Sequence, residues 1–343
     1  MTISRGHIGL LILLLAVPVV LAFGMAIGSV SVPLGFTLKT LWGALTGGLE
    51  DPSDRMVQIV LNLRLPRTLA AFLVGAGLSI IGVAMQALVR NPLAEPYVLG
   101  ISSGASAGAS LFYMGLLPAF LVANIDISLA AFLGALLSIS VVYAVARGGG
   151  RLSVSRLLLA GVALAALMSA VSSFVWFAAP DANRTRAVMF WLMGSFHSAT
   201  WDDLPLAALV TFGGGGLLMA LAHPLDALLT GEEPARSLGV RVEILKKTLI
   251  VISALVTGVL VSISGAIGFV GLIVPHSVRG LFGVGHRWVL PGSFLAGGLF
   301  LVLADTVSQV LLPGQQLPVG IVTAVLGVPF FLVLLRRTEY QFR

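Results

Sequence analysis

The sequence contains no cysteine, and only 10% of its 343 residues are charged. The first absence excludes disulfides, a thiol nucleophile and a cysteine metal site. The second excludes an ordinary soluble globular protein, in which charged residues make up about a quarter of the chain. No Gly-Lys dipeptide occurs, so the phosphate-binding loop of an ATPase is absent too. The chain instead has 58% apolar residues and a mean hydropathy of +1.05, which predicts a polytopic membrane protein.

Apolar runs long enough for membrane helices recur along the chain. The first follows Arg5 and His7, and we interpret it as an uncleaved helix because it is too long for the apolar region of a signal peptide. The sequence predicts an all-α fold, a single transmembrane domain over residues 1–343. Its ten apolar spans are expected at 8–28, 65–88, 99–118, 127–146, 154–177, 204–222, 248–264, 269–282, 289–311 and 319–335.

Basic residues are distributed unevenly between the two ends of these spans. If the N-terminus is cytoplasmic, fourteen of the twenty Lys and Arg residues fall on the cytoplasmic side and six on the other. This arrangement satisfies the positive-inside rule, so we expect both chain ends in the cytoplasm. The basic residues are scattered in ones to threes rather than gathered on one face, which argues against a nucleic-acid partner despite a pI near 10.3.

Residues 226–247 form the one stretch with the composition of a soluble protein. This stretch carries eight charged side chains, whereas the flanking segments 205–222 and 248–261 carry none. Thr230 is predicted to cap a short helix with acidic residues in its first turn, and Gly239 to bend the chain before a second short helix. Such a charged loop suits the docking of a soluble partner, and a solvated loop without a partner is the alternative.

Glycine is abundant, with 40 residues, and some glycines are regularly spaced. Gly100, Gly104 and Gly108 recur every four residues, which places small side chains on one helix face. Such stripes allow close helix packing in lipid, where no hydrophobic force drives helices together. We expect the same one helix earlier, at Gly75, Gly77 and Gly82.

Residues that could serve in catalysis, metal binding or proton transfer are scarce. Asp305 is essentially the only ionisable residue inside the apolar spans, and its place near a helix end favours a hydrogen-bonded or interfacial acid over a proton relay. The histidines show no paired spacing, so we expect no metal site, and no residue set supports an enzyme. A secondary transporter driven by protons or sodium would need buried acids and broken helices, neither of which the sequence shows.

Segments 64–110, 155–164, 265–279 and 303–337 closely resemble the FecCD family. The most specific matches are NPLAEPYVLG at 91–100 and GFVGLIVPHSVR at 268–279. Members are ten-helix permeases of bacterial ABC importers for ferric siderophores, haem and vitamin B12. The resemblance implies a multi-pass homodimer in the bacterial inner membrane, two separate ATPase subunits that hold ATP and Mg²⁺, and a periplasmic substrate-binding protein. It implies no cofactor on this chain. The expected substrate is a ferric siderophore or haem, with vitamin B12 as the alternative.

The resemblance also assigns residues by position. The loop that couples to the ATPase would use Gly231, Glu232, Ala235, Arg236, Leu238, Gly239 and Val240. The cytoplasmic gate would be formed by Ser153, Val154, Ser155 and Leu159. The translocation path would be lined by Met168, Phe174, Trp176, Met189, Phe190 and Met193. The binding protein would dock on outward-facing Arg64, Arg67 and Gln309.

Three positions depart from the family pattern. Relatives commonly carry Arg near the end of the ninth helix and Glu just before a Leu-Pro pair, whereas this chain has Gln309 and Gln316. His197 ends a short outer helix expected at 187–196, where the family usually has small residues. An imidazole there is either a ligand for haem iron or a plain interfacial histidine.

Overall fold

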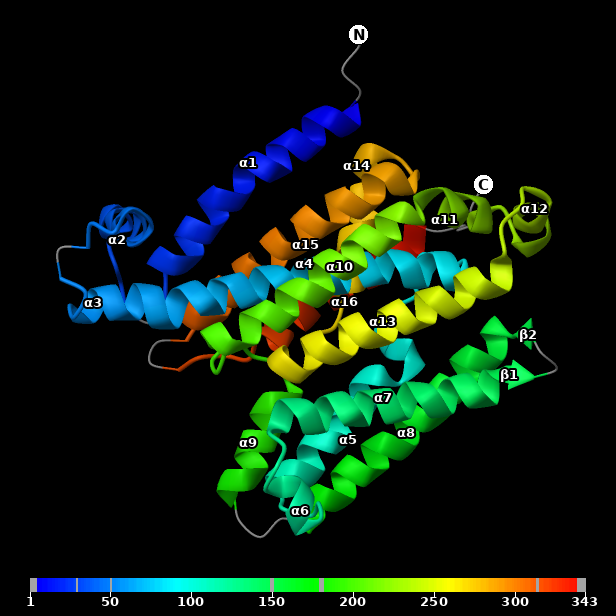
Figure 1. Cartoon of the computed structure of the whole chain (residues 1–343), viewed down its shortest axis with the longest axis horizontal. Helices are drawn as coiled ribbons and strands as arrows, with labels where there is room; N and C mark the ends of the chain where they lie inside the picture. The colour runs from blue at the N-terminus through cyan, green and yellow to red at the C-terminus, as the bar shows by residue number, and fades with distance from the viewer. Residues whose placement is uncertain are drawn as a thin grey trace.

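The computed structural model describes residues 5–28, 30–49, 51–148, 151–178, 182–312 and 315–337, and its fold is all-α (Figure 1). Eight helices are long and apolar enough to cross a membrane. One shorter apolar helix, α14, has 13 residues, as does α5. The helices at the ten predicted spans are α1 (Arg5–Ala26), α4 (Leu65–Val89), α5 (Ile101–Tyr113), α7 (Ile127–Ala146), α8 (Val154–Phe177), α10 (Leu204–Ala220), α13 (Val242–Ser264), α14 (Val270–Phe282), α15 (His286–Val310) and α16 (Val319–Arg337). Each coincides with a predicted span.

Shorter elements connect these helices, and they define the two ends of the bundle. We call them the α3 end and the α12 end, which lie on opposite sides in Figure 1. The α3 end carries α2 (Leu34–Thr46), α3 (Arg55–Gln58), the π-helical η1 (Ile59–Arg64), α9 (Ala182–Leu192) and η3 (Trp201–Asp203). The α12 end carries β1 (Arg147–Gly148), β2 (Arg151–Leu152), α11 (Ala222–Leu229) and α12 (Glu232–Ser237). The remaining short elements are η2 (Pro96–Leu99) and α6 (Ala119–Val122).

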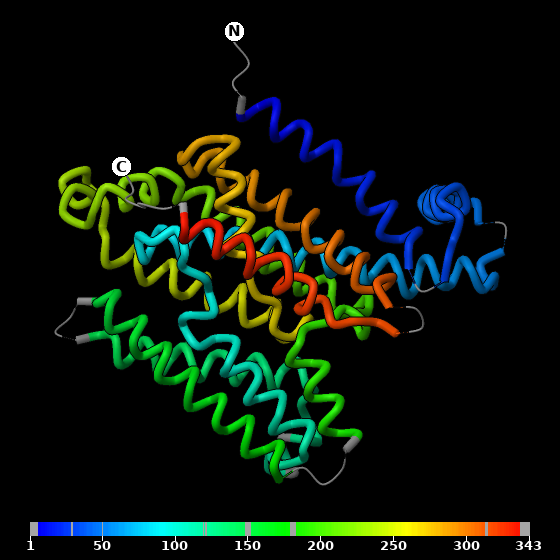
Figure 2. The backbone as a smooth tube through the Cα atoms, turned by 180° about the vertical axis from the view of Figure 1, so that it is seen from behind, coloured from blue at the N-terminus to red at the C-terminus, as the bar shows by residue number. Residues whose placement is uncertain are grey.

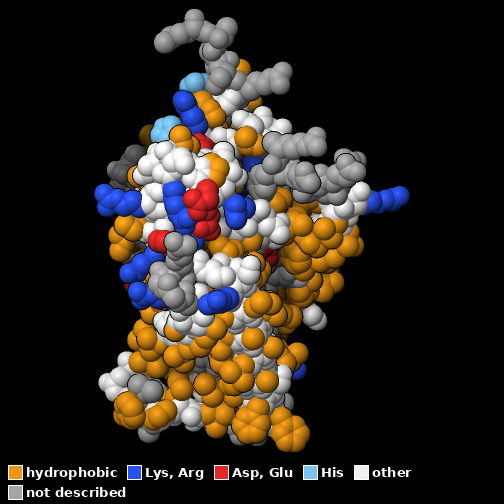
Figure 3. Space-filling view, turned by 90° about the vertical axis from the view of Figure 1, so that its right-hand side faces the viewer, with side chains coloured by type: hydrophobic (Ala, Val, Ile, Leu, Met, Phe, Trp, Pro, Cys, Tyr) orange, Lys and Arg blue, Asp and Glu red, His pale blue; other side chains and the backbone are white. Residues whose placement is uncertain are grey.

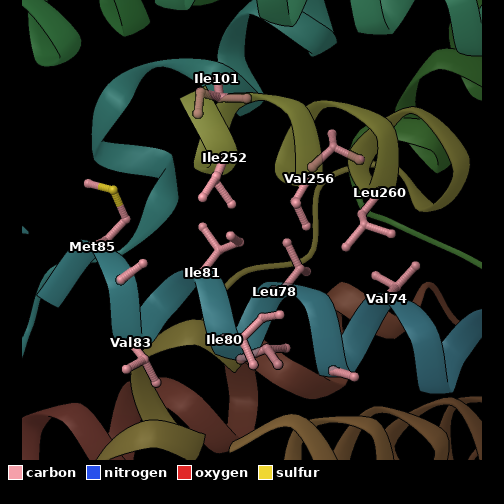
Figure 4. Packing of buried hydrophobic residues seen from close by; sticks show 14 of the residues in the cluster. Val74, Leu78, Ile80, Ile81, Val83, Met85, Ile101, Ile252, Val256 and Leu260 are labelled. Atoms are coloured by element: carbon pink, nitrogen blue, oxygen red, sulfur yellow. The ribbon is translucent and has the colours of Figure 1, made fainter. Parts of the chain in front are cut away.

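Helix α4 lies at the centre of the fold. It belongs to one continuous helical run, Arg55–Val89, whose most apolar window is 89% buried. Figure 4 shows Leu78 and Ile81 pointing toward α13, where they face Ile252 and Val256, while Ile80 points away from it. Because α4 is surrounded on all sides, its apolar residues follow no single face, as expected for the central helix of a membrane bundle.

Glycines let the neighbours of α4 approach its backbone. A Cβ placed on Gly75 would lie 2.2 Å from the carbonyl oxygen of Gly297 on α15, and one on Gly82 would lie 2.1 Å from that of Gly271 on α14. Any larger residue would push the helices apart. The predicted role of these glycines in close packing is therefore confirmed.

Helices α5, α7, α8 and α9 form a second group beside the first (Figures 1 and 2). The predicted small-residue stripe lies at its centre. A Cβ on Gly104 would lie 2.5 Å from the carbonyl oxygen of Gly134, and one on Gly108 would lie 2.3 Å from that of Ala130, both on α7. Helix α13 contacts α7 and so joins the second group to the first.

Several long helices bury little of their surface. The most apolar windows of α1 and α8 are each 17% buried, and that of α16 is 28% buried. These windows are apolar but mostly uncovered by the rest of the chain. Lipid or another protein chain must therefore cover them in a membrane.

Two helices are interrupted rather than continuous. Residues 90–100 lead into α5 and residues 265–269 lead into α14, and apart from η2 these leads are not helical. Arg90 and Phe269, which stand in these leads, are the non-glycine residues with positive φ among those described, at 53° and 69°. Both leads fall at breaks between predicted spans, 65–88 and 99–118 in one case and 248–264 and 269–282 in the other.

Candidate functional site

The charged loop lies at the α12 end. Figure 3 looks onto that end and shows Lys, Arg, Asp and Glu gathered on it, above a surface of mostly hydrophobic side chains. Helix α12 begins after Gly231, whose φ is 123°. The prediction that Thr230 caps this helix is wrong, since the Thr230 hydroxyl donates to the Ala227 carbonyl oxygen at 2.8 Å. Gly239 bends the chain with φ of 85°, and the second predicted short helix is the first part of α13.

Lys246 is the centre of this end, although it is 1% exposed. Its amine donates to the carbonyl oxygen of Leu152 at 2.9 Å. The amine also lies 2.8 Å from the Glu243 carboxylate and 3.2 Å from that of Glu232. A buried amine is tolerated because these oxygens replace its hydration.

The Lys246 cluster, consisting of Lys246, Glu232, Glu243 and the Leu152 backbone, joins three separate segments. Glu243 accepts a hydrogen bond from the Leu152 N–H at 3.0 Å, so both backbone groups of Leu152 are held by α13. Glu232 belongs to α12. The next residue after Leu152 is Ser153, which caps α8 by accepting from the Arg156 N–H at 3.4 Å. The cluster thus connects the charged loop to the start of α8.

The predicted coupling residues divide into an inner and an outer set. Ala235 is fully buried, and Arg236 pairs with Glu232, Glu233 and Glu243. Leu238, in contrast, is 71% exposed. It borders a groove of about 540 Å³ that is also lined by His223, Gly239, Val240 and Ile244. An exposed leucine over an apolar groove in a charged surface is a typical docking feature.

The predicted gate and path residues lie on α8 and α9. Leu159 and Phe174 are 71% and 67% exposed. Ser155 is exposed as well, whereas Val154 is half-buried. Met189 and Phe190 are also exposed, and Met168 is half-buried. These residues therefore face away from the packed interior of a single chain.

Two of the residues predicted to line the path, Trp176 and Met193, pack against other parts of the chain. Trp176 packs against a small cluster of Met114, Val175 and Val188 rather than on the open surface. Met193 is half-buried, and its carbonyl oxygen lies 2.1 Å from where a Cβ on Gly320 of α16 would stand. This contact brings α16 against the end of α9.

A cavity of about 820 Å³ lies beside α9 at the α3 end. Aromatic and polar side chains share its wall, including Tyr113, Arg186, Phe190, Trp191, His197 and Gln316. Helix α9 ends at Leu192, so His197 lies in the segment after it rather than at its end. The cavity is large enough for a bulky small molecule.

A second polar cluster is buried near this cavity. Arg67 binds both carboxylate oxygens of Asp305 at 2.8 Å, and the two residues are 8% and 3% exposed. Gln309 donates to Asp305 at 2.9 Å, and Arg67 donates to Gln316 at 2.8 Å. We call these four residues the Arg67 cluster. Asp305 is a hydrogen-bonded acid, as predicted, with an arginine partner that the sequence did not reveal.

The two arginines predicted as docking residues lie at the α3 end, but their side chains are mostly buried. Arg64 is 7% exposed and donates to the carbonyl oxygens of Met25 and Ala26 at 2.7 Å, and also to that of Val30. Neither Arg64 nor Arg67 presents a free charge at the surface. His197 approaches the same cluster, with its Nδ1 3.2 Å from the Gln316 Oε1.

The two departures from the family pattern meet in this cluster. Gln309 and Gln316 lie on either side of the Arg67–Asp305 pair. An Arg and a Glu at these places would add one charge of each sign. With glutamine at both places the cluster has the same net charge as with Arg and Glu, so the two departures balance each other. Among the described residues, no group of three or more His, Asp or Glu side chains could hold a metal ion.

In the described part of the chain, eight candidate spans, a shorter apolar helix and one charged end together define a polytopic membrane protein. The chain belongs to the FecCD transport family, whose sequence profile matches residues 13–337. The family consists of permease subunits of ABC importers.

Individual relatives are named for the transport of different substrates. The chain is 44% identical to the cobalamin import system permease protein BtuC of Halobacterium salinarum, over 88% of this chain and 80% of that protein. It is 39% identical to the hemin transport system permease protein HmuU of Yersinia pestis, over 98% and 97%. A solved inward-facing structure of an ABC transporter assigned to the metal-chelate type superposes with a TM-score of 0.80 at 29% identity, covering 97% and 100%.

Proposed function

We propose that this permease moves an iron chelate, a ferric siderophore or haem, from the periplasm to the cytoplasm. The cavity beside α9 supports a large and partly aromatic substrate, since Phe190 and Trp191 stand in its wall together with Arg186 and His197. Cobalamin is the second candidate, because a relative named for cobalamin import is 44% identical. ATP and Mg²⁺ would be held by two partner ATPase subunits.

The α12 end would face the cytoplasm, with both chain termini on that side of the inner membrane. Two observations support this orientation. The basic residues are concentrated toward that side. The exposed Leu238 and the groove next to it fit a soluble ATPase. Two copies of the chain would meet along the uncovered faces of α8, α9 and α16.

The observation that best supports coupling between the ATPase and the gate is the Lys246 cluster. Movement of α12 on the ATPase would shift Glu232, and Lys246 would pass that shift to the Leu152 backbone. Leu152 directly precedes the predicted gate of Ser153, Val154, Ser155 and Leu159. A force on the coupling loop would thereby reach the gate through hydrogen bonds of 2.9 to 3.2 Å.

The Arg67 cluster would lie beneath the surface on which the periplasmic binding protein docks. Its role would be to hold that surface in shape, since the charges of Arg64 and Arg67 are buried. Arg64 fixes the end of α1, and Arg67 joins α4 to α15 and to Gln316. Docking would then depend on these residues through structure more than through long-range attraction.

Transport competition tests the proposal. The permease, its ATPase and its binding protein are reconstituted in vesicles with labelled haem, a labelled ferric siderophore or labelled cobalamin. ATP-dependent uptake of an iron chelate that excess cobalamin does not reduce is expected. Uptake of cobalamin alone would support the second candidate, and uptake driven by a proton or sodium gradient without ATP would contradict both.

His197 gives a narrower test of the substrate. If its imidazole binds haem iron during passage, His197→Ala should lower haem uptake while leaving siderophore uptake unchanged. Equal haem uptake by the variant and the parent would reduce His197 to an interfacial residue that hydrogen-bonds Gln316.

A further inference from the structure

The two interrupted helices meet at a junction, formed by the leads 90–100 and 265–269. The Tyr97 hydroxyl donates to the Ile267 carbonyl oxygen and accepts from the Ile267 N–H at 2.9 Å. The Phe269 N–H donates to the Glu95 carboxylate. Two side chains of one lead thereby hold three backbone groups of the other.

The junction touches α8, which carries the predicted path residues Met168, Phe174 and Trp176, and it also touches α16. A Cβ on Gly161 of α8 would lie 2.1 Å from the Val98 carbonyl oxygen. A Cβ on Gly327 of α16 would lie 2.3 Å from the Phe269 ring. The lead also begins beside the charged loop, since a Cβ on Gly231 would lie 3.7 Å from the Arg90 guanidinium. A change in the junction would therefore alter its contacts with α8 and α16.

The Phe269 backbone is strained. Its φ of 69° is rare for a residue with a large side chain, and such conformations persist only where surrounding contacts enforce them. Three contacts hold Phe269 in this conformation: the hydrogen bonds of Glu95 and Tyr97 and the close approach to Gly327. Loss of the Glu95 bond would remove one of the three.

Glu95 is unusual among these contacts because its Oε1 atom is buried and has no hydrogen-bond partner. Of the basic groups on neighbouring elements, Arg279 of α14 donates to the Gln86 side chain and has a second buried donor, Nε, without a partner. Arg90 lies near Gly231, and His276 of α14 packs edge-to-face on Phe330 of α16. Glu95 interacts electrostatically with the phenol of Tyr97. An unpaired buried carboxylate is costly, whereas a neutral carboxyl is tolerated.

We propose that Glu95 is a proton-binding residue that positions the junction: while its carboxyl is neutral the junction holds α8 and α16 together, and when the carboxyl ionises the junction loosens. Burial raises the pKa of Glu95 to about 7, from an ordinary value of 4.5. An opened junction would let water reach the carboxyl and return its pKa toward that ordinary value. Protons therefore favour the closed junction, and the closed junction is progressively destabilised as pH rises from 4.5 through 7.

Hydrogen exchange of the Ile267 and Phe269 amides measures the opening directly. The permease with its ATPase is placed in lipid nanodiscs, and exchange is compared between the parent and Glu95→Gln, which stays neutral and keeps an acceptor for Phe269. Dividing the parent rate by the variant rate removes the intrinsic pH dependence of exchange. From the two pKa values, this ratio should rise on the order of tenfold between about pH 6 and pH 8. Asp51→Asn, an exposed acid far from the junction, is the matched control and should leave the pH dependence unchanged.

Infrared spectroscopy of the parent complex supplies a test that needs no variant to fold. A neutral carboxyl band should be present below pH 7 and disappear as pH rises through 7. A rate ratio that does not change with pH, or a parent complex with no neutral carboxyl band at pH 6, would overturn the proposal. Its consequence for transport rests on the proposed function, but neither measurement uses substrate or ATP. A failed transport assay would therefore leave this inference standing.

Discussion

The two polar clusters at opposite ends of the bundle are built differently. In the Arg67 cluster, both members of the ion pair are less than a tenth exposed, and they join two long helices, α4 and α15. In the Lys246 cluster, the amine is buried, but the Glu232 and Glu243 side chains are 28% and 36% exposed. The ion pair of the first cluster is closed and neutral, whereas the second cluster is open to water and connects α13 to two short segments.

This difference predicts which cluster mainly stabilises the fold and which one can rearrange. A closed pair is destabilising to break because the remaining charge cannot reach water. An open cluster loses less, since water can replace a missing partner. The α3 end should therefore be rigid, and the α12 end should be able to change partners during a transport cycle.

Arg67→Met should have the largest effect on folding. It leaves Asp305 buried with only Gln309 as a donor, which should lower the free energy of unfolding by about 3–5 kcal/mol. Removing both charges in Arg67→Met/Asp305→Leu should recover most of that loss. Denaturant unfolding in detergent measures both. A single variant as stable as the parent would show that water already reaches the pair.

Gly239→Pro should break the open end without touching either cluster. Proline cannot adopt the φ of 85° found here, and it removes the N–H that donates to Arg236 at 2.9 Å, a local cost of about 3 kcal/mol. The membrane helices should stay folded while the ATPase no longer co-purifies. Gly239→Asn is the matched control, because asparagine tolerates positive φ. Full recovery of ATPase with the proline variant would exclude this loop as the docking element.

Gln309→Arg tests the neutrality of the closed cluster. Alone, it adds a second buried cation beside Arg67, so the unfolding free energy should fall by about 1–3 kcal/mol. Together with Gln316→Glu the charges balance again, and the double variant should be more stable than the sum of the single changes predicts. A double-mutant cycle measures this coupling, and strictly additive effects would contradict the charge-balance explanation.

Lys246→Met should have the smallest effect on stability, about 1 kcal/mol, because its carboxylate partners reach water. Lys247→Met, at the exposed neighbouring position, should cost almost nothing. Unfolding curves of the two variants give the comparison. A loss for Lys246→Met as large as that for Arg67→Met would mean that the two ends are equally closed.

The sequence predicts local features of this fold well. The ten helices and the close approaches at Gly82 and Gly104 follow from hydropathy and spacing, which act over a few residues. The clusters depend on distant partners instead: Arg67 and Asp305 are 238 residues apart, and Lys246 and Leu152 are 94 apart. Lys246 stands three residues after Glu243, which reads as an ordinary surface pair on a helix.

The sequence also did not predict the burial of Arg64 and Arg67 or the contact between the two leads. Arg64 and Arg67 stand at the edge of an apolar span, where arginines commonly reach toward water, yet carbonyl and carboxylate oxygens of the same chain bind them. The leads 90–100 and 265–269 fall largely between predicted spans, but the sequence does not show that they contact each other. Only the tertiary contacts of Tyr97 and Glu95 show why the chain is extended there.

We propose that the Lys246 cluster passes ATPase movement to the gate, and this proposal is tested by the ratio of substrate transported to ATP hydrolysed. This ratio is measured in vesicles for the parent, for Lys246→Met and for the matched control Lys247→Met. The account predicts that Lys246→Met still binds and runs the ATPase but transports at least about fivefold less per ATP, the lower end of a typical coupling free energy. Lys247→Met should match the parent. A parental ratio for Lys246→Met, with full transport, would contradict the account.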